Sequence, residues 1–416
     1  MCEGGDVSRR IALVSLHTSP LDVPGTGDAG GMNVYLVGLA AALRGRGFEV
    51  ELLTRDTGPG AAGGTDAHTA DGVPVRFLRA GPRASVAKSD LPGLADHFGR
   101  SMAELPPFDL VHSHYWLSGL AALPVARGWA APHVLGLHTV AALKNEQLAL
   151  GDRPEPPARV RAEAELVRAS DLTIAATTAE RSAILRATDA PAARVAVVPP
   201  GVDTHLFRPG GERPLHRRSA QSMLLVLARL QPLKGVDLAI RALAAIAPEQ
   251  RPRLVIAGGT SPGHDAYVSG LHGLVTALGL HDRVEFLPAQ SREAAAGLMR
   301  DADLLLVPSH SETYGLVALE AAASGTPVVA GRTSGLVESV VDGVTGVLVG
   351  ERTPEAWGRA IDDLLHDPRR LVTLGQSALR HGRTHSWAHT AEHLADHYER
   401  LLSQHRGSDR AQGEDG

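Results

Sequence analysis

The sequence predicts an α/β protein built from two doubly wound αβα domains that face one cleft. Its 416 residues exceed the size at which a single core stops growing. Short β-branched or leucine-rich runs alternate with longer Ala/Leu segments of helical period, which is typical of βαβ units with parallel sheets. A Pro-, Gly- and charge-rich stretch over 197–221 separates two series of such units and predicts the domain boundary.

The first series begins with "RIALVSL" and continues with short apolar runs, each followed by a longer amphipathic segment. Apolar runs of four to eight residues predict buried strands, and the longer segments predict the helices that cover them. The predicted strands are 10–16, 48–54, 73–79, 109–113, 133–137, 171–176 and 195–198. The predicted helices are 31–46, 90–104, 116–128, 157–170 and 178–188.

The second series repeats the alternation after the boundary. The predicted strands are 222–228, 253–258, 283–287, 303–307, 327–330 and 346–349. The predicted helices are 235–247, 265–279, 291–300, 315–324, 353–366 and 368–380. The chain therefore divides into a first domain over 1–205, a second domain over 206–385, a last helix over 386–404 and a polar tail over 405–416 that we expect to be disordered.

Composition and charge exclude several classes of protein. A net charge of −5 argues against a nucleic-acid binder, which is usually strongly basic. No apolar run reaches the ~18 residues that a membrane span needs, and the first residues do not resemble a signal peptide. The single cysteine, Cys2, excludes an intrachain disulfide or a cysteine metal cluster. We therefore expect a cytoplasmic protein that binds neither nucleic acid nor membrane.

Lysine is rare in this chain. Of the 41 basic residues, only Lys88, Lys144 and Lys234 are lysines, and each lies in or beside a predicted loop. Three residues are few enough for chance. The alternative is that these positions need a compact ammonium group, where the planar guanidinium used elsewhere would not serve.

Polar and glycine-rich segments follow six of the predicted strands. In open parallel sheets, ligands bind outside the carboxyl ends of the strands, so all six segments lie on the predicted ligand side. They are "GTGDAGGMN", "HSHYW", "HTVAALKN", "RLQPLKG", "GGTSPG" and "PSHSETYG". His112 and His114 have no third acidic or cysteine partner nearby, so we interpret them as loop histidines and not as metal ligands.

The glycine-rich loop before the first helix predicts an anion site. Glycines at a helix start let backbone N–H groups and the helix dipole face an anion, and we expect a substrate phosphate near Gly30 and Gly31. A nicotinamide dinucleotide site is disfavoured, because the loop lacks the tight G-x-G-x-x-G register and the acidic residue Asp56 comes late after the second strand.

Two further motifs predict a diphosphate and a sugar. Arg229 and Lys234 bracket a strand-to-helix turn and can direct two cations at one leaving diphosphate. Glu312 precedes the helix of 315–324 and Glu320 lies within it, so both carboxylates can face one crevice and accept hydrogen bonds from hydroxyls. The unpaired N–H groups of residues 315–317 suit a phosphate.

The segments "RLQPLKG" and "PSHSETYGLVALEAAASGTPVV" resemble the retaining glycosyltransferases that include sucrose synthases and phosphatidylinositol mannosyltransferases. The resemblance implies the GT-B fold, with two Rossmann-like domains and a C-terminal helix that packs back toward the N-terminal domain. The segments "LHTSPLDVPGTGDAGGMNVYL", "HSHYWLSG", "HTVAALKN" and "VVPPGVDTHLFRP" narrow it to the D-inositol-3-phosphate glycosyltransferases of mycothiol biosynthesis, within family 4. That family implies UDP-N-acetylglucosamine as donor, 1D-myo-inositol 3-phosphate as acceptor, and a homodimer.

The same resemblance implies roles for individual residues, carried over motif by motif. Donor-binding residues would be Val23, Pro24, Gly31, Arg229, Lys234, Gln290, Glu312 and Glu320, with Val23 in a place where glutamine is frequent. Acceptor-binding residues would be His17, Asp28, Ala29, Gly30, Gly31, Met32, Asn33, Lys88, Tyr115, Thr139 and Arg159. Catalysis would rest on His138, Arg229, Lys234 and Glu312. A peripheral magnesium ion, not required for the chemistry, would map to Met299, Arg300, Ala302 and Thr326.

Other functions stay open on the sequence. Sucrose-phosphate synthases share part of the N-terminal pattern. A lipid-acceptor mannosyltransferase would need a basic amphipathic helix near the acceptor, whereas residues 89–104 carry balanced charge. A sugar-nucleotide sensor without catalysis would not need the acceptor residues. We expect transfer with retention by front-face attack, because no carboxylate is placed as a nucleophile.

Overall fold

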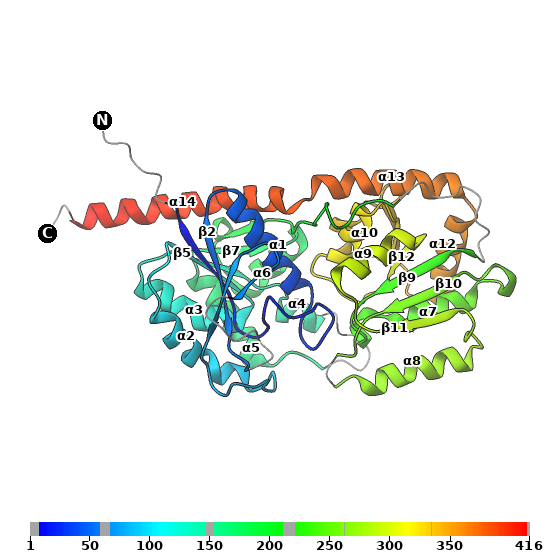
Figure 1. Ribbon diagram of the computed structural model, residues 1–416, viewed down its shortest axis with the longest axis horizontal. Coiled ribbons are helices and arrows are strands. Elements are labelled where there is room, and N and C mark those ends of the chain that lie inside the picture. Colours follow the sequence, from blue (N-terminus) through cyan, green and yellow to red (C-terminus); the bar gives the residue numbers. More distant parts are fainter. Residues whose placement is uncertain are drawn as a thin grey trace.

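The computed structural model describes residues 8–58, 67–146, 148, 153–210, 221–261, 263–333 and 335–413. Two open α/β sheets lie side by side along the long axis of the molecule (Figure 1). Cys2, residues 211–220 of the predicted boundary and residues 414–416 of the predicted tail lie outside the described residues.

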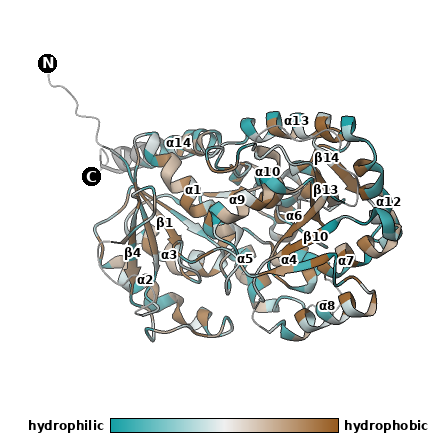
Figure 2. Cartoon of the chain, turned by 45° about the vertical axis from the view of Figure 1, so that its right-hand side comes forward, coloured by the Kyte–Doolittle hydropathy of each residue, from teal (hydrophilic) through white to brown (hydrophobic). Residues whose placement is uncertain are grey.

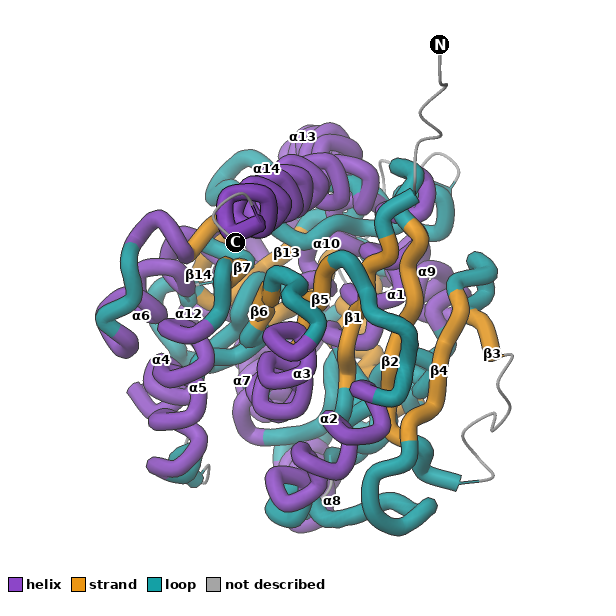
Figure 3. The backbone as a smooth tube through the Cα atoms, turned by 90° about the vertical axis from the view of Figure 1, so that its left-hand side faces the viewer, coloured by secondary structure: helices purple, strands orange, loops and turns teal. Residues whose placement is uncertain are grey.

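The first sheet has eight strands in the order β3-β4-β2-β1-β5-β6-β7-β8, and all pairings are parallel except that of β3 with β4. Its strands are β1 (Arg10–Ser15), β2 (Glu49–Arg55), β3 (Ala67–His68), β4 (Pro74–Leu78), β5 (Leu110–His114), β6 (His133–Gly136), β7 (Leu172–Ala175) and β8 (Val195–Val197). Its helices are α1 (Gly31–Gly45), α2 (Ala95–Ala103), α3 (Trp116–Gly128), α4 (Ala141–Glu146), α5 (Pro157–Ala169) and α6 (Thr178–Thr188). Figure 3 views this sheet from its own end of the molecule.

The second sheet has six parallel strands in the order β11-β10-β9-β12-β13-β14. Its strands are β9 (Met223–Leu227), β10 (Arg253–Ala257), β11 (Val284–Leu287), β12 (Leu304–Val307), β13 (Val328–Gly331) and β14 (Gly346–Val349). Its helices are α7 (Val236–Ala245), α8 (Asp265–Ala277), α9 (Arg292–Asp301), α10 (Leu316–Ala323), α11 (Leu336–Ser339), α12 (Pro354–Leu365) and α13 (Pro368–Thr384). The predicted domain limit at 205/206 falls between β8 and β9.

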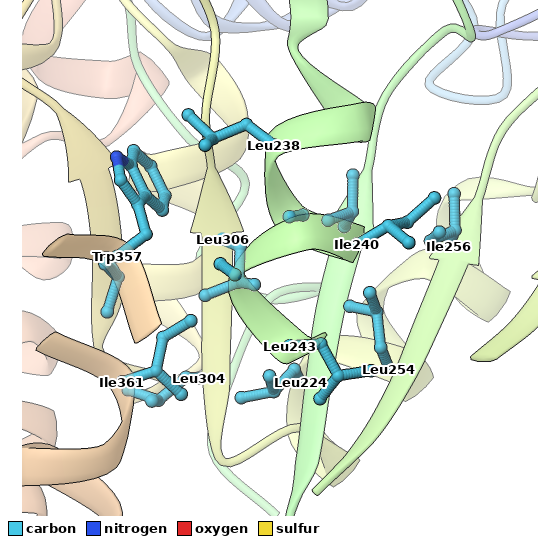
Figure 4. Close-up of a cluster of buried hydrophobic side chains, with 14 of the residues drawn as sticks. Leu224, Leu238, Ile240, Leu243, Leu254, Ile256, Leu304, Leu306, Trp357 and Ile361 are labelled. Carbon is cyan, nitrogen blue, oxygen red and sulfur yellow. The ribbon is translucent and has the colours of Figure 1, made fainter. Parts of the chain in front are cut away.

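The strands are apolar on both faces because helices cover both sides of each sheet. In Figure 2 the strands are mainly brown, and the outer helices carry the teal, hydrophilic positions. Figure 4 shows one such layer of the second sheet, where Trp357 and Ile361 of α12 and Leu243 of α7 pack on side chains of β9, β10 and β12. No helix among the described residues combines the length and apolar character that a bilayer crossing requires.

Short polar residues start several of these helices where the sequence changes from strand to helix. The hydroxyls of Thr177, Ser291 and Thr353 accept hydrogen bonds from backbone N–H groups in the first turns of α6, α9 and α12. The Asp367 carboxylate does the same for α13. Each N-cap satisfies a donor that the helix itself leaves without a partner.

The last helix, α14 (Trp387–Gly413), leaves the second domain and packs on the first, as predicted. Trp387, Leu394 and Tyr398 are buried in the same hydrophobic core as α1 and the strands of the first sheet. The indole of Trp387 lies against Gly38 of α1, where a Cβ atom would approach Trp387 Cε2 to 2.3 Å. The crossover helix therefore ties the two domains together.

The predicted GT-B fold is confirmed, and the differences concern short elements and helix ends. The expected helix over 90–104 is a 3₁₀ turn (Leu91–Leu94) followed by α2, because Pro92 and Gly93 interrupt the α-helical start. The prediction omitted β3, α4 and α11, which have two, six and four residues and are too short to show a period.

The predicted limit of the last helix at residue 404 is too early, and so is the start of the predicted disordered tail at 405. In the structure α14 continues to Gly413. Arg406, Arg410, Ala411 and Gln412 are good helix formers, and extending an existing helix needs no new nucleus.

Candidate active site

A cleft of about 860 Å³ is lined by residues from both domains. The first domain contributes the segments after β1, β4, β5, β6 and β7, and the second contributes the segments after β9, β10, β11 and β12. These segments all follow the carboxyl ends of parallel strands, and the ones after β1, β5, β9 and β12 flank the points where the strand order of each sheet reverses. This is where open α/β sheets bind their ligands.

Most of the predicted site residues line this cleft. They are His17, Pro24, Asp28, Gly30, Gly31, Met32, Lys88, Tyr115, His138, Thr139, Arg159, Arg229, Lys234, Gln290, Glu312 and Glu320. Three predicted binding residues do not line it, namely Val23, Ala29 and Asn33. Val23 points to solvent with 49% of its surface exposed, whereas Ala29 and Asn33 are buried.

All three lysines of the chain line the cleft. Lys88 Nζ lies 3.6 Å from Asp28 Oδ1, Lys144 Nζ lies 2.5 Å from Glu155 Oε1, and Lys234 Nζ lies 2.7 Å from Glu312 Oε1. Lysine is therefore found only at the cleft in this chain. This favours the interpretation that these positions need a compact ammonium.

Asn33 holds the glycine-rich loop in shape. Its Oδ1 accepts a hydrogen bond from Gly30 N–H at 2.9 Å, and its Nδ2 donates to Thr18 Oγ1 at 2.9 Å and to Ser19 O at 2.6 Å. Both amide protons are used within the loop, so the side chain of Asn33 supports the cleft wall from behind. The acceptor contact predicted for Asn33 stays a prediction.

The glycines of the same loop let it approach the second domain. Gly25 has a φ of +91°, and a Cβ on it would lie 3.5 Å from Ala289. Gly31 packs against Leu316 at the start of α10, where a Cβ would come within 3.3 Å. The backbone of the loop thus forms one wall of the cleft without side chains that would fill it.

Arg229 crosses the cleft to that loop. Its Nη1 donates to Gly27 O at 3.4 Å, and its guanidinium lies beside Gly30. Burial lowers the pKa of Arg229, with Asp28 and Glu312 acting in the opposite direction. A partly desolvated cation of this kind favours an anion as its neighbour.

Lys234 and Glu312 meet on the second-domain wall. Glu312 Oε1 accepts from Lys234 Nζ and from Ser309 Oγ, each at 2.7 Å. Lys234 is the last residue of a 3₁₀ turn (Pro232–Lys234), which is followed by Gly235 with a φ of +62°. A Cβ atom added to Gly235 would lie 2.2 Å from Pro308 O. A glycine at this position lets the turn pack against the loop that carries Glu312.

The N-terminus of α10 supplies backbone donors next to this pair. Gly315 has a φ of +91° and precedes α10, and the N–H groups of Leu316 and Val317 have no acceptor among the described residues. Unpaired N–H groups at a helix start favour a phosphate.

Glu320 lies within α10 with Arg292 Nη1 at 3.5 Å from its Oε1. Burial raises the pKa of Glu320 to about 7, although Arg292 acts to lower it. A carboxylate in this position can accept hydrogen bonds from sugar hydroxyls once it is ionised. Gln290, also predicted, lines the same part of the cleft and donates to Pro288 O at 2.7 Å.

The first-domain wall gathers the predicted acceptor residues around Tyr115. The Arg159 guanidinium lies 4.8 Å and Lys88 Nζ 5.6 Å from the centre of the Tyr115 ring, and the His17 ring packs against it at 4.3 Å. Tyr115 has a φ of +76°, which is uncommon for a residue with a Cβ atom. Two cations on one aromatic ring form a suitable pocket for a phosphate.

Arg159 is held by a buried network that the sequence did not predict. Its Nε donates to Glu163 Oε1 at 2.7 Å, its Nη1 pairs with Glu155 Oε2 at 2.9 Å, and its Nη2 donates to Thr139 Oγ1 at 2.8 Å. The side chain of Arg159 is only 5% exposed. The surrounding residues therefore fix the direction of the guanidinium before any ligand arrives.

His138 lies where the two walls meet. Thr313 Oγ1 of the second domain donates to His138 O at 2.7 Å, and His138 itself has a φ of +59°. Burial lowers the pKa of His138 to about 4, so its ring is neutral at physiological pH.

The sequence analysis interpreted His112 and His114 as loop histidines, and this interpretation is wrong. They lie on β5 and are fully buried. The strand continues to His114 because the parallel register with β6 runs to the pair His114 and Gly136.

Several cleft residues were not predicted. Tyr35, Glu155, Glu180, Arg292, Ser309 and Thr313 line the cleft. Ser309 and Thr313 lie within the quoted segment "PSHSETYG", where their position beside Glu312 was a usable signal. Arg292 and Glu180 lie on helices, and only the three-dimensional structure brings them to the cleft.

Two family models match the chain. The model described as "Glycosyl transferase 4-like domain" covers residues 30–201, and "Glycosyl transferases group 1" covers residues 212–381. Between them they cover most of both domains.

Similar proteins extend the match over the whole chain. A D-inositol 3-phosphate glycosyltransferase of Kineococcus radiotolerans is 43% identical over 97% of this chain and 97% of its own length. One of Mycolicibacterium gilvum is 42% identical over 97% of this chain and 92% of its own.

Solved structures support the fold. A sucrose-phosphate synthase of Thermosynechococcus elongatus superposes with a TM-score of 0.86 at 27% identity, over 95% of this chain and all of that chain. The Anabaena protein HepE, in complex with UDP and glucose, superposes with a TM-score of 0.75 at 21% identity, over 94% of this chain and 99% of that one. With its two matched domains and relatives above 40% identity over nearly its full length, the chain is a GT-B glycosyltransferase and belongs to the D-inositol 3-phosphate glycosyltransferase family.

Proposed function

We propose that this glycosyltransferase transfers N-acetylglucosamine from UDP-N-acetylglucosamine to 1D-myo-inositol 3-phosphate, with retention of the anomeric configuration. The products are N-acetylglucosaminyl-inositol 3-phosphate and UDP, and the reaction is the first step of mycothiol biosynthesis. Relatives that carry this acceptor in their names are 42–43% identical to the chain.

One observation carries the proposal, namely two separate sets of anion-binding groups on opposite walls of one cleft. Arg229, Lys234 and the start of α10 lie on the second-domain wall and suit the diphosphate of a nucleotide sugar. Lys88 and Arg159 lie on the first-domain wall, over Tyr115, and suit a phosphomonoester. With an acceptor that carries its own phosphate, both sets have an anion to bind. A neutral acceptor would leave Lys88 and Arg159 without one.

The charges of the cleft favour direct front-face attack. As the bond to the sugar breaks, negative charge develops on the leaving diphosphate, and fixed cations stabilise it. The departing phosphate oxygen then takes the proton of the attacking hydroxyl. Of the five carboxylates that line the cleft, Asp28, Glu155, Glu312 and Glu320 are each paired with a cation. The fifth, Glu180, is buried, and burial raises its pKa to about 7, which makes it a poor nucleophile. This set supports a mechanism without a carboxylate nucleophile.

The experiment measures UDP release from UDP-N-acetylglucosamine with inositol 3-phosphate and, separately, with fructose 6-phosphate. We expect release with inositol 3-phosphate and far less with fructose 6-phosphate. A preference for fructose 6-phosphate would favour a sucrose-phosphate synthase activity instead. Tight sedimentation of the protein with liposomes would favour a lipid acceptor, and binding of the nucleotide sugar without UDP release would favour a sensor.

The proposal includes a peripheral magnesium ion near the end of α9, held by Met299, Arg300, Ala302 and Thr326. Backbone carbonyls at a helix C-terminus attract cations, which supports this location. Thr326 Oγ1 donates to Met299 O at 2.6 Å, so these two residues lie side by side, and the hydroxyl oxygen keeps its lone pairs for a cation. Since this ion lies away from the residues that line the cleft, we assign it no step in the transfer.

We further propose that the enzyme is a cytoplasmic homodimer that binds neither nucleic acid nor membrane. The donor and acceptor are small charged molecules, and the resemblance of the chain to its family implies the dimer. Light scattering on the purified protein measures the mass directly, and a value of one 43.6 kDa chain would contradict the dimer.

A further inference from the structure

Three histidine rings converge beside Gly136, at the end of β6. His114 Nδ1 and His138 Nε2 are 2.9 Å apart, which is a hydrogen bond. A Cβ atom on Gly136 would lie 3.4 Å from His112 Nε2 and 3.5 Å from both His114 Nδ1 and His138 Nε2. Because residue 136 has no side chain, the three nitrogens share one small space at the wall of the cleft, which Gly136, His114 and His138 line.

The rings are fixed by one another and by neighbouring aromatic side chains. The His112 and His114 rings pack at 4.1 Å, and His112 Nδ1 lies 2.6 Å from the hydroxyl of Tyr398 on α14. Tyr35 packs edge-on against His138 at 5.0 Å and against Trp387 at 5.4 Å. The crossover helix therefore supports the histidine group through two aromatic side chains.

The hydrogen bond between His114 and His138 can be made in two ways. Burial lowers the pKa of both histidines, so each ring carries a single proton at physiological pH. If His138 Nε2–H donates, the proton of His114 lies on Nε2, which is buried and has no acceptor among the described residues. If His114 Nδ1–H donates instead, His114 Nε2 carries only a lone pair. A buried N–H without an acceptor is the rarer and more costly of the two.

We propose that His114 is a positioning residue for His138: its Nδ1–H donates to His138 Nε2 and holds His138 in the tautomer that carries its proton on Nδ1. His138 then offers a neutral N–H donor from its other ring nitrogen, which has no partner among the described residues. Such a donor can bind a sugar hydroxyl, or it can stabilise the negative charge that develops on the departing phosphate. The inference rests on the proposed function, for which His138 is one of the expected catalytic residues.

The tautomer can be measured without any substrate. In protein labelled with ¹⁵N-histidine, long-range proton–nitrogen correlation spectra distinguish a protonated Nδ1 from a protonated Nε2, and the signals of His138 are those lost in His138→Gln. We expect a protonated Nδ1 in the unchanged protein. His114→Leu removes the donor and should release this preference, whereas His114→Asn, whose amide nitrogen can replace Nδ1, should keep it.

Kinetics give the second measurement. We expect His114→Leu to lower kcat about tenfold, the value of one lost hydrogen bond, with the KM of both substrates changed less than about threefold. His114→Asn should recover most of kcat. The matched control is His133→Asn, a buried histidine on β6 whose ring nitrogens bond to Ser113 and Ser170 and which does not line the cleft. It should lower the melting temperature and leave kcat unchanged.

Three results would overturn the inference. They are a protonated Nε2 on His138 in the unchanged protein, an unchanged kcat in His114→Leu, or equal losses of kcat and melting temperature in both His114 variants, which would indicate packing alone. Failure of the proposed function is distinguishable, because the unchanged protein would then release no UDP with inositol 3-phosphate while the tautomer measurement would still give its result.

Discussion

Glu338 of the second domain accepts hydrogen bonds from the backbone N–H groups of Thr178 and Ala179 in the first domain, at 2.9 and 3.0 Å. These two donors belong to the first turn of α6, so one carboxylate binds the N-terminus of a helix across the domain interface. Glu338 itself lies in the short helix α11. This helix is preceded by Gly335, whose N–H donates to Glu312 O at 3.1 Å. The interface contact therefore connects to the loop that carries Glu312 and Thr313.

The first prediction is that Glu338→Ala weakens the closed arrangement of the domains. A carboxylate at a helix N-terminus contributes about 0.3–1 kcal/mol, up to about 2 when partly buried, so the closed state should lose several-fold in population. We expect kcat/KM to fall about three- to tenfold and the radius of gyration from X-ray scattering to rise. Glu355→Ala is the control, since Glu355 lies in the first turn of α12 and is exposed. An unchanged radius and unchanged kinetics in Glu338→Ala would show that the contact does not hold the domains.

The second prediction concerns the two cations of the proposed diphosphate site. Lys234→Met removes the ammonium and leaves Glu312 without its ion-pair partner, and Arg229→Met removes the half-buried guanidinium. Loss of one such group costs about 10²–10³ in kcat when it stabilises charge in the transition state. We expect losses in this range, measured as UDP release at saturating acceptor. Arg241→Met, an exposed arginine on α7, should retain full activity. Full activity in both cleft variants would rule out this site as the diphosphate site.

The third prediction is a pH dependence of donor binding. Burial raises the pKa of Glu320 to about 7, and the ionised carboxylate accepts hydrogen bonds from hydroxyls more strongly than the protonated acid does. The KM for UDP-N-acetylglucosamine should therefore fall as the pH rises from about 6 to about 8, and Glu320→Gln should remove this dependence. The nucleotide sugar is a better probe than UDP, whose terminal phosphate titrates in the same range. A pH dependence that persists in Glu320→Gln would assign it to another group.

The same shift predicts the sign of an effect on stability. Since the pKa of Glu320 is raised above its ordinary 4.5, the folded state holds a proton that the unfolded state releases between about 4.5 and about 7. Glu320→Gln should thus raise the free energy of unfolding, and this increase should become larger as the pH rises through this window. Urea denaturation of both proteins at pH 5 and pH 8 measures the difference, and a gain that is larger at pH 5 would contradict the assignment.

Whether a site residue could be predicted from the sequence depends on how the fold brings it to the cleft. The cleft residues Arg229, Lys234 and Glu312 were predictable because parallel strands bring all their carboxyl ends to one edge. The group around Tyr115 needed the family resemblance, because its members come from four separate segments. The network that holds Arg159 was not predictable, since a helical sequence such as "ARVRAEAEL" gives the same pattern when its charges face solvent.

The contacts between domains were also beyond the sequence. Glu338 lies in a four-residue helix that no periodic pattern reveals, and its partners are backbone groups 160 residues away. The burial of His112 and His114 depends on α14, because the hydroxyl of Tyr398 arrives from the far end of the chain. Local patterns predict elements and their edges, whereas pairs distant in sequence depend on how the domains and the last helix dock.

The fourth prediction tests the docking of α14 on α1. Gly38 is a glycine in a helix interior, normally a weak choice, but its missing side chain makes room for the Trp387 indole. In Gly38→Ala the new methyl would lie 2.3 Å from Trp387 Cε2, so the indole or the helix must move. Such overpacking costs about 1–3 kcal/mol, and we expect a lower melting temperature together with lower activity, because Trp387 also packs on Tyr35 beside His138.

The matched control lies in the same helix. Gly45 ends α1, a Cβ atom on it would have nothing within 4 Å, and its φ is not positive. Gly45→Ala should therefore stabilise the protein by about 0.4–1 kcal/mol through the entropy of the unfolded chain, with unchanged activity. Differential scanning calorimetry of both variants compares one substitution at two positions of one helix. If Gly38→Ala were as stable as Gly45→Ala, the close approach of α14 to α1 would not exist in solution.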